Sequence, residues 1–293
     1  MTRLSAFLLL ALANLLWSGN WIAGRALRGS FEPVTLNFLR WVVAIAVLAP
    51  FALPALRGKW PLIRRNAGIL LLLAFTGVAL FQSLVYLGLR STAAVNAVLL
   101  NSSLPMFILA CSWLIERERA SPRQVAGMLI SLAGILVILS RGDPAALLHL
   151  DVHAGDGWVL LAMPVWGIYS VLLKRRPPEL GGLELLFVIS VAGMLMLLPV
   201  AAFETVLHPP RWPAPAEIAG VLYMGIAASV LAFFFWNRGV AVVGANAAGF
   251  TIHLLPAFAT ILAIVFLGEA FAGFHAAGIA TIIAGVLLAT SRK

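Results

Sequence analysis

Charged residues are scarce in this chain, and their scarcity excludes most classes of soluble protein. Of the 293 residues, 11% are charged and 62% are hydrophobic. A soluble domain has roughly 25% charged and 45–50% apolar residues, and a soluble chain of this length could not bury so much apolar surface. The composition therefore excludes a soluble enzyme, a disordered chain and an ordinary nucleic-acid-binding protein.

Cysteine and the common metal and nucleotide motifs are also rare or missing. Cys111 is the only cysteine, which excludes an internal disulfide and a cysteine-based metal cluster. The sequence has no G-x-x-x-x-G-K-[ST] run and no H-E-x-x-H motif, so nothing indicates an ATP-driven engine or an intramembrane hydrolase. We therefore expect a protein that is not an enzyme, with no catalytic residue, no cofactor and no metal site.

The sequence instead contains ten long apolar runs. A helix needs roughly 20 apolar residues to cross a bilayer, and none of the runs shows the period-two alternation of barrel strands. We therefore expect an all-α membrane protein with ten transmembrane helices. The runs are 4–24, 33–56 (interrupted only by Arg40), 66–89, 91–115, 124–140, 157–173, 185–203, 218–237, 239–268 and 270–291.

Lysine and arginine are unevenly distributed between the expected loops. If the N-terminus lies on one side, that side holds 14 of the 20 basic residues, the other side holds 5, and Arg40 is the last. Basic loops stay in the cytoplasm, so both termini are predicted to be cytoplasmic. The same assignment places the polar linker that contains Asp151 and Asp156 outside, in the periplasm.

The two halves of the sequence resemble each other at a nearly constant offset. Trp17 matches Trp166 at an offset of 149. At an offset of 151 the matches are Pro105 with Pro256, Phe107 with Phe258, Glu118 with Glu269, Gly127 with Gly278 and Gly134 with Gly285. The sequence is thus predicted to hold a first five-helix repeat (1–145), a periplasmic linker (146–156) and a second five-helix repeat (157–293).

An odd number of spans in each repeat inverts the second repeat relative to the first. Inverted repeats are a recurrent plan of secondary transporters, in which the substrate binds near the bilayer midplane at the repeat interface. Two similar halves of opposite orientation allow two arrangements of similar energy, one open inward and one open outward. This pattern is the first indication of function.

Polar and aromatic residues inside six of the runs share one face of each expected helix. They predict a central cavity lined by runs 4–24, 66–89, 91–115, 157–173, 218–237 and 239–268. Each residue alone could also be an interfacial aromatic or a polar contact between helices, but the set favours a cavity. The candidate substrate-binding residues are Trp17, Gln82, Tyr86, Asn101, Ser102, Trp166, Tyr169, Trp236 and His253.

Four residues within the runs allow two interpretations each. Arg40 either contacts an anion or a carboxylate, or is a structural cation that bonds helix-end carbonyls or reaches an interface. Pro105 and Pro256 are either hinges beside the site or static kinks. His253 either accepts a transported proton, since the ordinary pKa of histidine is about 6.5, or only forms hydrogen bonds.

Three stretches of the sequence resemble a known family. They are Leu16-Trp17-Ser18-Gly19-Asn20-Trp21, then Pro33 through Arg40-Trp41, and Pro105 through Glu118-Arg119 with its echo from Pro256 to Gly268-Glu269. The chain resembles the EamA-type ten-helix exporters of the drug/metabolite transporter superfamily, and within it the bacterial exporters of aromatic amino acids. A lysine that often ends the first helix in that family is absent, because Gly24-Arg25 stands there.

The resemblance and the residues together imply a secondary transporter. We expect export of amino acids, with aromatic or hydrophobic ones preferred, across the bacterial inner membrane by alternating access. Export of toxic organic cations or other small metabolites is the alternative, and an intramembrane enzyme or a lipid scramblase is the alternative from another class. The expected partners are the small-molecule substrate and the bilayer, without nucleic acid, and a monomer is one option for the oligomeric state.

Overall fold

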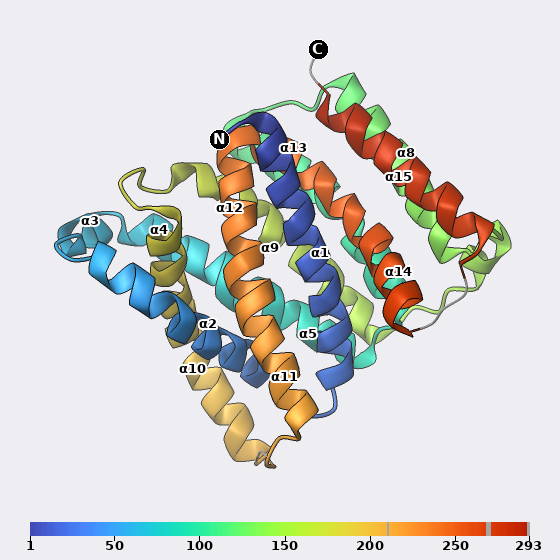
Figure 1. Cartoon of the computed structure of the whole chain (residues 1–293). Coiled ribbons are helices and arrows are strands. Elements are labelled where there is room, and N and C mark those ends of the chain that lie inside the picture. Colours follow the sequence, from blue (N-terminus) through green and yellow to red (C-terminus); the bar gives the residue numbers. More distant parts are fainter. Residues whose placement is uncertain (210, 268–270, 292–293) are drawn as a thin grey trace.

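The computed structural model describes residues 1–209, 211–267 and 271–291, and within these ranges the chain forms helices and loops without a strand (Figure 1). Among the described residues ten helices are long and apolar enough to cross a membrane, which confirms the predicted number. Gly268, Glu269, Arg292 and Lys293, which enter the repeat or the charge count, lie outside the described residues. The uninterrupted spans are α1 (Arg3–Leu27), α2 (Pro33–Ala55), α8 (Pro122–Leu139), α9 (Ala154–Leu172), α10 (Gly182–Leu207) and α15 (Gly273–Thr290).

Four spans are interrupted, and the interruptions recur in equivalent spans of the two halves. The third span consists of α4 (Ala67–Leu73), the π-helical η1 (Ala74–Leu80) and α5 (Phe81–Ser91), and the eighth of α11 (Pro215–Tyr223), the π-helical η4 (Met224–Leu231) and α12 (Ala232–Val243). The fourth consists of α6 (Ala94–Asn101) and α7 (Leu104–Glu116), and the ninth of α13 (Ala245–Phe250), the 3₁₀ turn η5 (Thr251–His253) and α14 (Leu254–Leu267). The short helices α3 (Trp60–Arg65) and η2 (Pro144–His149) lie between spans, and the 3₁₀ turn η3 (Leu173–Arg175) ends the sixth span after α9.

Each of the two matched prolines lies in the first turn of the helix that follows a break, a position that the sequence did not specify. Pro105 is the second residue of α7, and Pro256 is the third residue of α14. In the first turn of a helix the missing N–H of proline removes no intrahelical hydrogen bond. The chain therefore turns before each proline instead of bending at it.

The boundary between the eighth and ninth spans also differs from the expected one. The sequence placed it at Arg238, but α12 continues to Val243 and ends at Gly244, which has a φ of +84°. Such a φ is accessible to glycine without strain. Arg238 stays in the helix with its guanidinium 5.5 Å from the centre of the Phe234 ring, so a basic residue in the sequence did not end the span.

Large apolar side chains are exposed on the outside of the bundle. Leu4, Phe203 and Leu287 are between 62% and 71% exposed. A surface with so many exposed apolar groups is unfavourable in water and suits contact with lipid. The outside of the structure thus agrees with a protein that spans the membrane many times.

The helices pack in a pattern that is unchanged when the halves are exchanged. The first span, α1, packs on the eighth (α12) and the ninth (α14), and its equivalent α9 packs on the third (α5) and the fourth (α7). The second span, α2, packs on its own equivalent α10, and α8 packs on α15. The contacts therefore follow an approximate two-fold symmetry between the halves.

The α8–α15 pair lies at one edge of the molecule (Figure 1) and is joined by four matched glycines. A Cβ added at Gly127 would lie 2.5 Å from the Gly285 carbonyl oxygen, and one at Gly134 would lie 2.7 Å from that of Gly278. Since residue numbers rise in α8 as they fall in α15, the two helices are antiparallel. Glycine lets their backbones approach closely, as small residues do in membranes.

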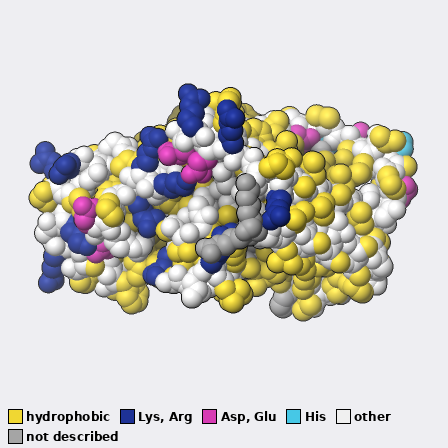
Figure 2. All heavy atoms as spheres, turned by 90° about the horizontal axis from the view of Figure 1, so that it is seen from above, with side chains coloured by type: hydrophobic (Ala, Val, Ile, Leu, Met, Phe, Trp, Pro, Cys, Tyr) yellow, Lys and Arg dark blue, Asp and Glu magenta, His cyan; other side chains and the backbone are white. Residues whose placement is uncertain are grey.

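The start of α1 and the end of α15 lie at the same face of the molecule, because the Arg3 guanidinium donates to the Thr290 carbonyl at 2.7 Å. Figure 2 shows this face from above, with Lys and Arg side chains gathered on it among a few acidic ones. The ion pairs agree with the predicted sides. Lys59 and Glu184 join two segments assigned to the N-terminal side, and Arg90 and Glu32 join two assigned to the other side.

We expect Gly127→Ala to destabilise the protein by about 1–3 kcal/mol, the usual cost of overpacking. The new Cβ would meet backbone atoms of Gly285 and Ala289, which cannot move independently of α15. Gly68→Ala in α4 is the matched control, since its Cβ would meet nothing within 4 Å. Thermal unfolding in detergent measures both, and equal midpoints for the two variants would contradict the close α8–α15 contact.

Candidate functional site

A small cavity lies inside the bundle between six spans. It has room for about 30 Å³, which is enough for about one or two water molecules. The lining side chains come from the first, third, fourth, sixth, eighth and ninth spans, the six whose polar and aromatic faces predicted a cavity. They are Trp17, Asn20, Trp21, Phe81, Gln82, Asn101, Leu104, Trp166, Phe233, Ile252 and Leu255.

Four of the candidate substrate-binding residues line this cavity. Trp17 and Trp166, the repeat-matched pair, provide apolar walls, and Gln82 and Asn101 provide amide groups. The amide nitrogen of Asn101 is buried without a hydrogen-bond partner in the described part of the chain. The cavity thus combines aromatic surface with a few polar groups, the usual composition of a small-molecule site.

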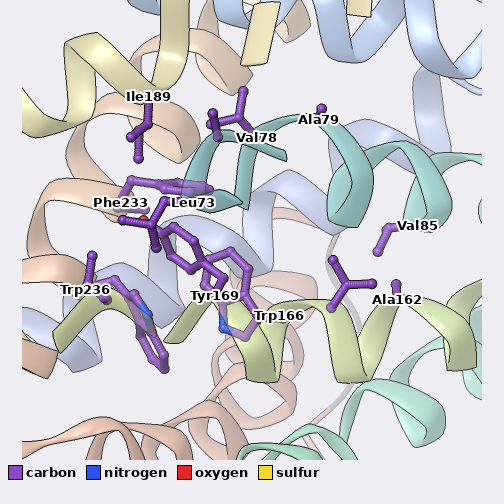
Figure 3. Close-up of a cluster of buried hydrophobic side chains, with 14 of the residues drawn as sticks. Leu73, Val78, Ala79, Val85, Ala162, Trp166, Tyr169, Ile189, Phe233 and Trp236 are labelled. Atoms are coloured by element: carbon purple, nitrogen blue, oxygen red, sulfur yellow. The ribbon is translucent and has the colours of Figure 1, made fainter. Parts of the chain in front are cut away.

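Aromatic rings from both halves pack around the cavity. The Trp166 ring lies at the centre of the cluster, with ring centroids at 5.2 Å for Trp17, 4.7 Å for Phe81 and 5.4 Å for Phe233. Figure 3 shows Trp166 beside Tyr169, with Phe233 and Trp236 close to them. Rings at these separations attract each other by edge-to-face or offset contacts, so the packing of the cluster forms the aromatic wall of the cavity.

Trp236 and Tyr169 belong to this cluster but do not line the cavity. The Trp236 ring is fully buried 5.7 Å from that of Trp166. Tyr169 is also fully buried, 5.0 Å from Trp166, and donates its hydroxyl hydrogen to Asn237 Oδ1 at 2.8 Å. Both residues support the rings that face the cavity.

Tyr86 lies behind the cavity wall in the first half. Its hydroxyl hydrogen bonds to Asn20 Oδ1 at 3.2 Å and accepts a hydrogen bond from Arg40 Nη1 at 2.8 Å. The pair Asn20–Tyr86 joins the first and third spans, as Tyr169–Asn237 joins the sixth and eighth. Tyr86 therefore does not line the cavity itself but contacts Asn20, which does.

His253 and Ser102 lie where the broken fourth and ninth spans meet. They are 151 residues apart, which is the repeat offset, and the His253 Nε2 atom lies 2.9 Å from the Ser102 carbonyl oxygen. The Nδ1 atom of His253 bonds to Ser131 on α8. His253 is only 1% exposed, so it bridges the halves with both ring nitrogens occupied and does not line the cavity.

The sequence did not single out all of the lining residues. Asn20 and Trp21 belong to the stretch that carries the family resemblance, and Phe233 shares a helix face with Trp236. Sequence patterns therefore pointed to these three residues. Phe81 and Leu104 had none, because an ordinary apolar residue in an apolar run looks the same whether it faces lipid or a cavity.

We expect His253→Ala to cost about 2 kcal/mol of stability, because it removes both hydrogen bonds that the ring makes to the first half. The control is His208→Ala, which changes an exposed histidine at the end of α10. Thermal unfolding in detergent should show a lower midpoint for the first variant only. An unchanged midpoint for His253→Ala would contradict its bridging role.

The chain matches one family model over most of its length and many individual proteins over nearly all of it. Residues 4–140 and 153–291 match the EamA-like transporter family. The uncharacterized transporter YetK of Bacillus subtilis is 28% identical over 99% of this chain and 88% of its own length. A solved crystal structure superimposes with a TM-score of 0.73 and 25% identity, covering 99% of this chain and 97% of that one.

Two further relatives have names that include a substrate. A protein of Ancylobacter novellus named aromatic amino acid exporter YddG is 28% identical over 99% of this chain and 98% of its own length. One of Streptantibioticus cattleyicolor named probable terminal-alkyne amino-acid exporter is 28% identical over 97% and 92%. The ten spans and the two matched segments agree, and the chain belongs to the EamA-like transporter family.

Proposed function

We propose that this protein exports amino acids with aromatic or hydrophobic side chains across the bacterial inner membrane. The observation that carries the proposal is the ring of Trp17, Phe81, Trp166 and Phe233 around a cavity that also holds the amides of Gln82 and Asn101. Two relatives named as amino acid exporters support the same substrate class.

The cavity suits a zwitterion with an apolar side chain. Stacking and edge-to-face contacts with the tryptophan rings favour an aromatic side chain. The amides of Gln82 and Asn101 can both donate and accept hydrogen bonds, so they suit a carboxylate and an ammonium group alike. Among the described residues that line the cavity none is acidic, which fits a substrate without net charge.

Transport requires the cavity to open, because an amino acid does not fit into about 30 Å³. In our proposal the two repeats, 1–145 and 157–293 with the linker 146–156 between them, are inverted and rock around the cavity. The two-fold contact pattern supports this arrangement. The breaks before Pro105 and Pro256 are the hinges that we propose for the motion, since a broken span bends at lower cost than a continuous helix.

The orientation that we propose follows from the loops. Fourteen basic residues on the side of both termini against five on the other favour cytoplasmic termini. Export then means loading from the face shown in Figure 2.

Export of organic cations is the second candidate, supported by the tryptophan-rich wall, which can attract a cation through its ring faces. Cation export is disfavoured because none of the described residues that line the cavity is acidic, and because the cationic Arg40 lies behind Asn20. An enzyme or a lipid scramblase is disfavoured by the family, whose relatives are named as transporters. Proton coupling would need His253 to change partners, so we assign His253 a bridging role.

We expect Trp166→Ala to lower amino-acid flux about tenfold, since the ring contacts that it removes are worth about 1.4 kcal/mol. The assay is counterflow of labelled phenylalanine in proteoliposomes of purified protein. The matched control is Trp158→Ala, which changes a 45% exposed tryptophan on the same helix, and it should transport like the wild type.

Trp166→Phe keeps a ring at this position and should keep most of the flux, which separates loss of the ring from loss of folding. No phenylalanine flux by the wild type, together with flux of a quaternary dication, would replace the leading proposal with the second candidate. Equal flux in Trp166→Ala and Trp158→Ala would show that the aromatic cluster does not bind substrate.

A further inference from the structure

Arg40 on α2 is a buried cation without an acidic partner. Its side chain is 1% exposed, and in the described part of the chain no carboxylate lies within ion-pair distance of it. A guanidinium keeps its charge in proteins, and a buried charge without a counter-ion is costly. An anion bound beside Arg40 would remove this cost, and in a transporter that anion can belong to the substrate.

The neighbours of Arg40 are neutral and leave part of it unsatisfied. Nε donates to Ser229 Oγ at 2.6 Å, and Nη1 donates to Tyr86 Oη at 2.8 Å and to Asn20 Oδ1 at 3.3 Å. Nη2 has no hydrogen-bond partner among the described residues. The arrangement therefore fixes the guanidinium but leaves donors free for another group.

The π-helical segment of the eighth span packs closely against α2 and binds this guanidinium through Ser229. Ser229 donates its hydroxyl hydrogen to the Met224 carbonyl, five residues earlier, at 2.8 Å, which leaves its oxygen lone pairs to accept from Arg40. Gly225 lets the segment approach α2, because a Cβ there would lie 2.9 Å from the Arg40 carbonyl oxygen. π-helical segments occur frequently at functional sites.

Asn20 connects Arg40 to the cavity. It lines the cavity, and its Oδ1 atom accepts from both Arg40 and Tyr86 at the long distances of 3.3 and 3.2 Å. A carboxylate can replace these long contacts to a neutral oxygen, since guanidinium–carboxylate pairs form shorter and often bidentate hydrogen bonds.

We infer that Arg40 is the carboxylate subsite of the transporter, an inference that rests on the proposed function. The substrate carboxylate displaces the Asn20 amide oxygen and occupies the free donors of Arg40, while the substrate side chain contacts Trp166 and Phe233. Arg40 then selects for a carboxylate and repels an amine that lacks one.

Four phenyl compounds test this in proteoliposomes, by competition with counterflow of labelled phenylalanine. Phenylalanine and 3-phenylpropionate carry the carboxylate, whereas phenylalaninamide and phenethylamine lack it. In the wild type, the first two should inhibit about 10- to 100-fold more strongly than the last two, the ratio expected for a charged hydrogen bond. In Arg40→Gln this ratio should fall to about one and labelled phenethylamine should be carried.

Arg90→Gln is the matched control, because it removes an arginine in the last turn of α5, where it pairs with Glu32, and should keep the ratio of the wild type. Equal inhibition of the wild type by phenylalanine and phenylalaninamide would overturn the inference, whether or not Arg40→Gln folds. Equal loss of flux for every compound in a folded Arg40→Gln would also overturn it, by showing a structural role only.

A binding measurement separates the subsite from the proposed function. Stabilisation of the purified wild type against heat by 3-phenylpropionate, absent with phenethylamine and lost in Arg40→Gln, supports the subsite even if phenylalanine is not transported. Stabilisation by chloride to the same extent as by 3-phenylpropionate would show a site for small inorganic anions and overturn the assignment to substrate. No stabilisation and no flux would overturn both proposals.

Discussion

The structure depends on one constraint, which is that a helix broken inside a membrane must find hydrogen-bond partners in other helices. The ninth span meets this requirement with α1, since the Leu255 carbonyl accepts from the Ser18 hydroxyl at 3.0 Å. The side-chain oxygen of Thr251 also accepts from the Asn14 amide of α1, at 3.1 Å. In the third span, Asn37 donates to the Val78 carbonyl at 3.0 Å within the π-helical segment. Each irregular segment is thus held by side chains of a neighbouring span.

The same contacts form the cavity. Trp17 donates from Nε1 to the Ala228 carbonyl in the π-helical segment of the eighth span at 3.1 Å, and this bond orients its ring toward Trp166. His253 joins the break of the ninth span to that of the fourth. The groups that satisfy the interrupted helices therefore also position rings of the site, and the four interrupted spans are among the six that line the cavity.

Sequence patterns predict those features of the fold that depend on residues close together in the chain. The ten spans follow from run length, and the six spans around the cavity follow from helical periodicity. The π-helical segments have no such signal, because Gly77 and Gly225 in apolar runs fit a regular helix equally well. The bridge from His253 to Ser102 and Ser131 depends on packing between distant spans, so the sequence left its role open.

Arg40 makes an otherwise symmetric site directional. Each half contains a tyrosine–asparagine hydrogen bond beside the cavity, Asn20–Tyr86 in the first and Tyr169–Asn237 in the second. The first carries a guanidinium, whereas at the offset of 149 that relates Trp17 to Trp166 the second half has Ile189 in place of Arg40. A two-fold scaffold binds a substrate equally well in two opposite orientations, but a cation on one side favours one of them. With the carboxylate at Arg40, the side chain is directed toward Trp166 in the second half, so a single substrate contacts both halves.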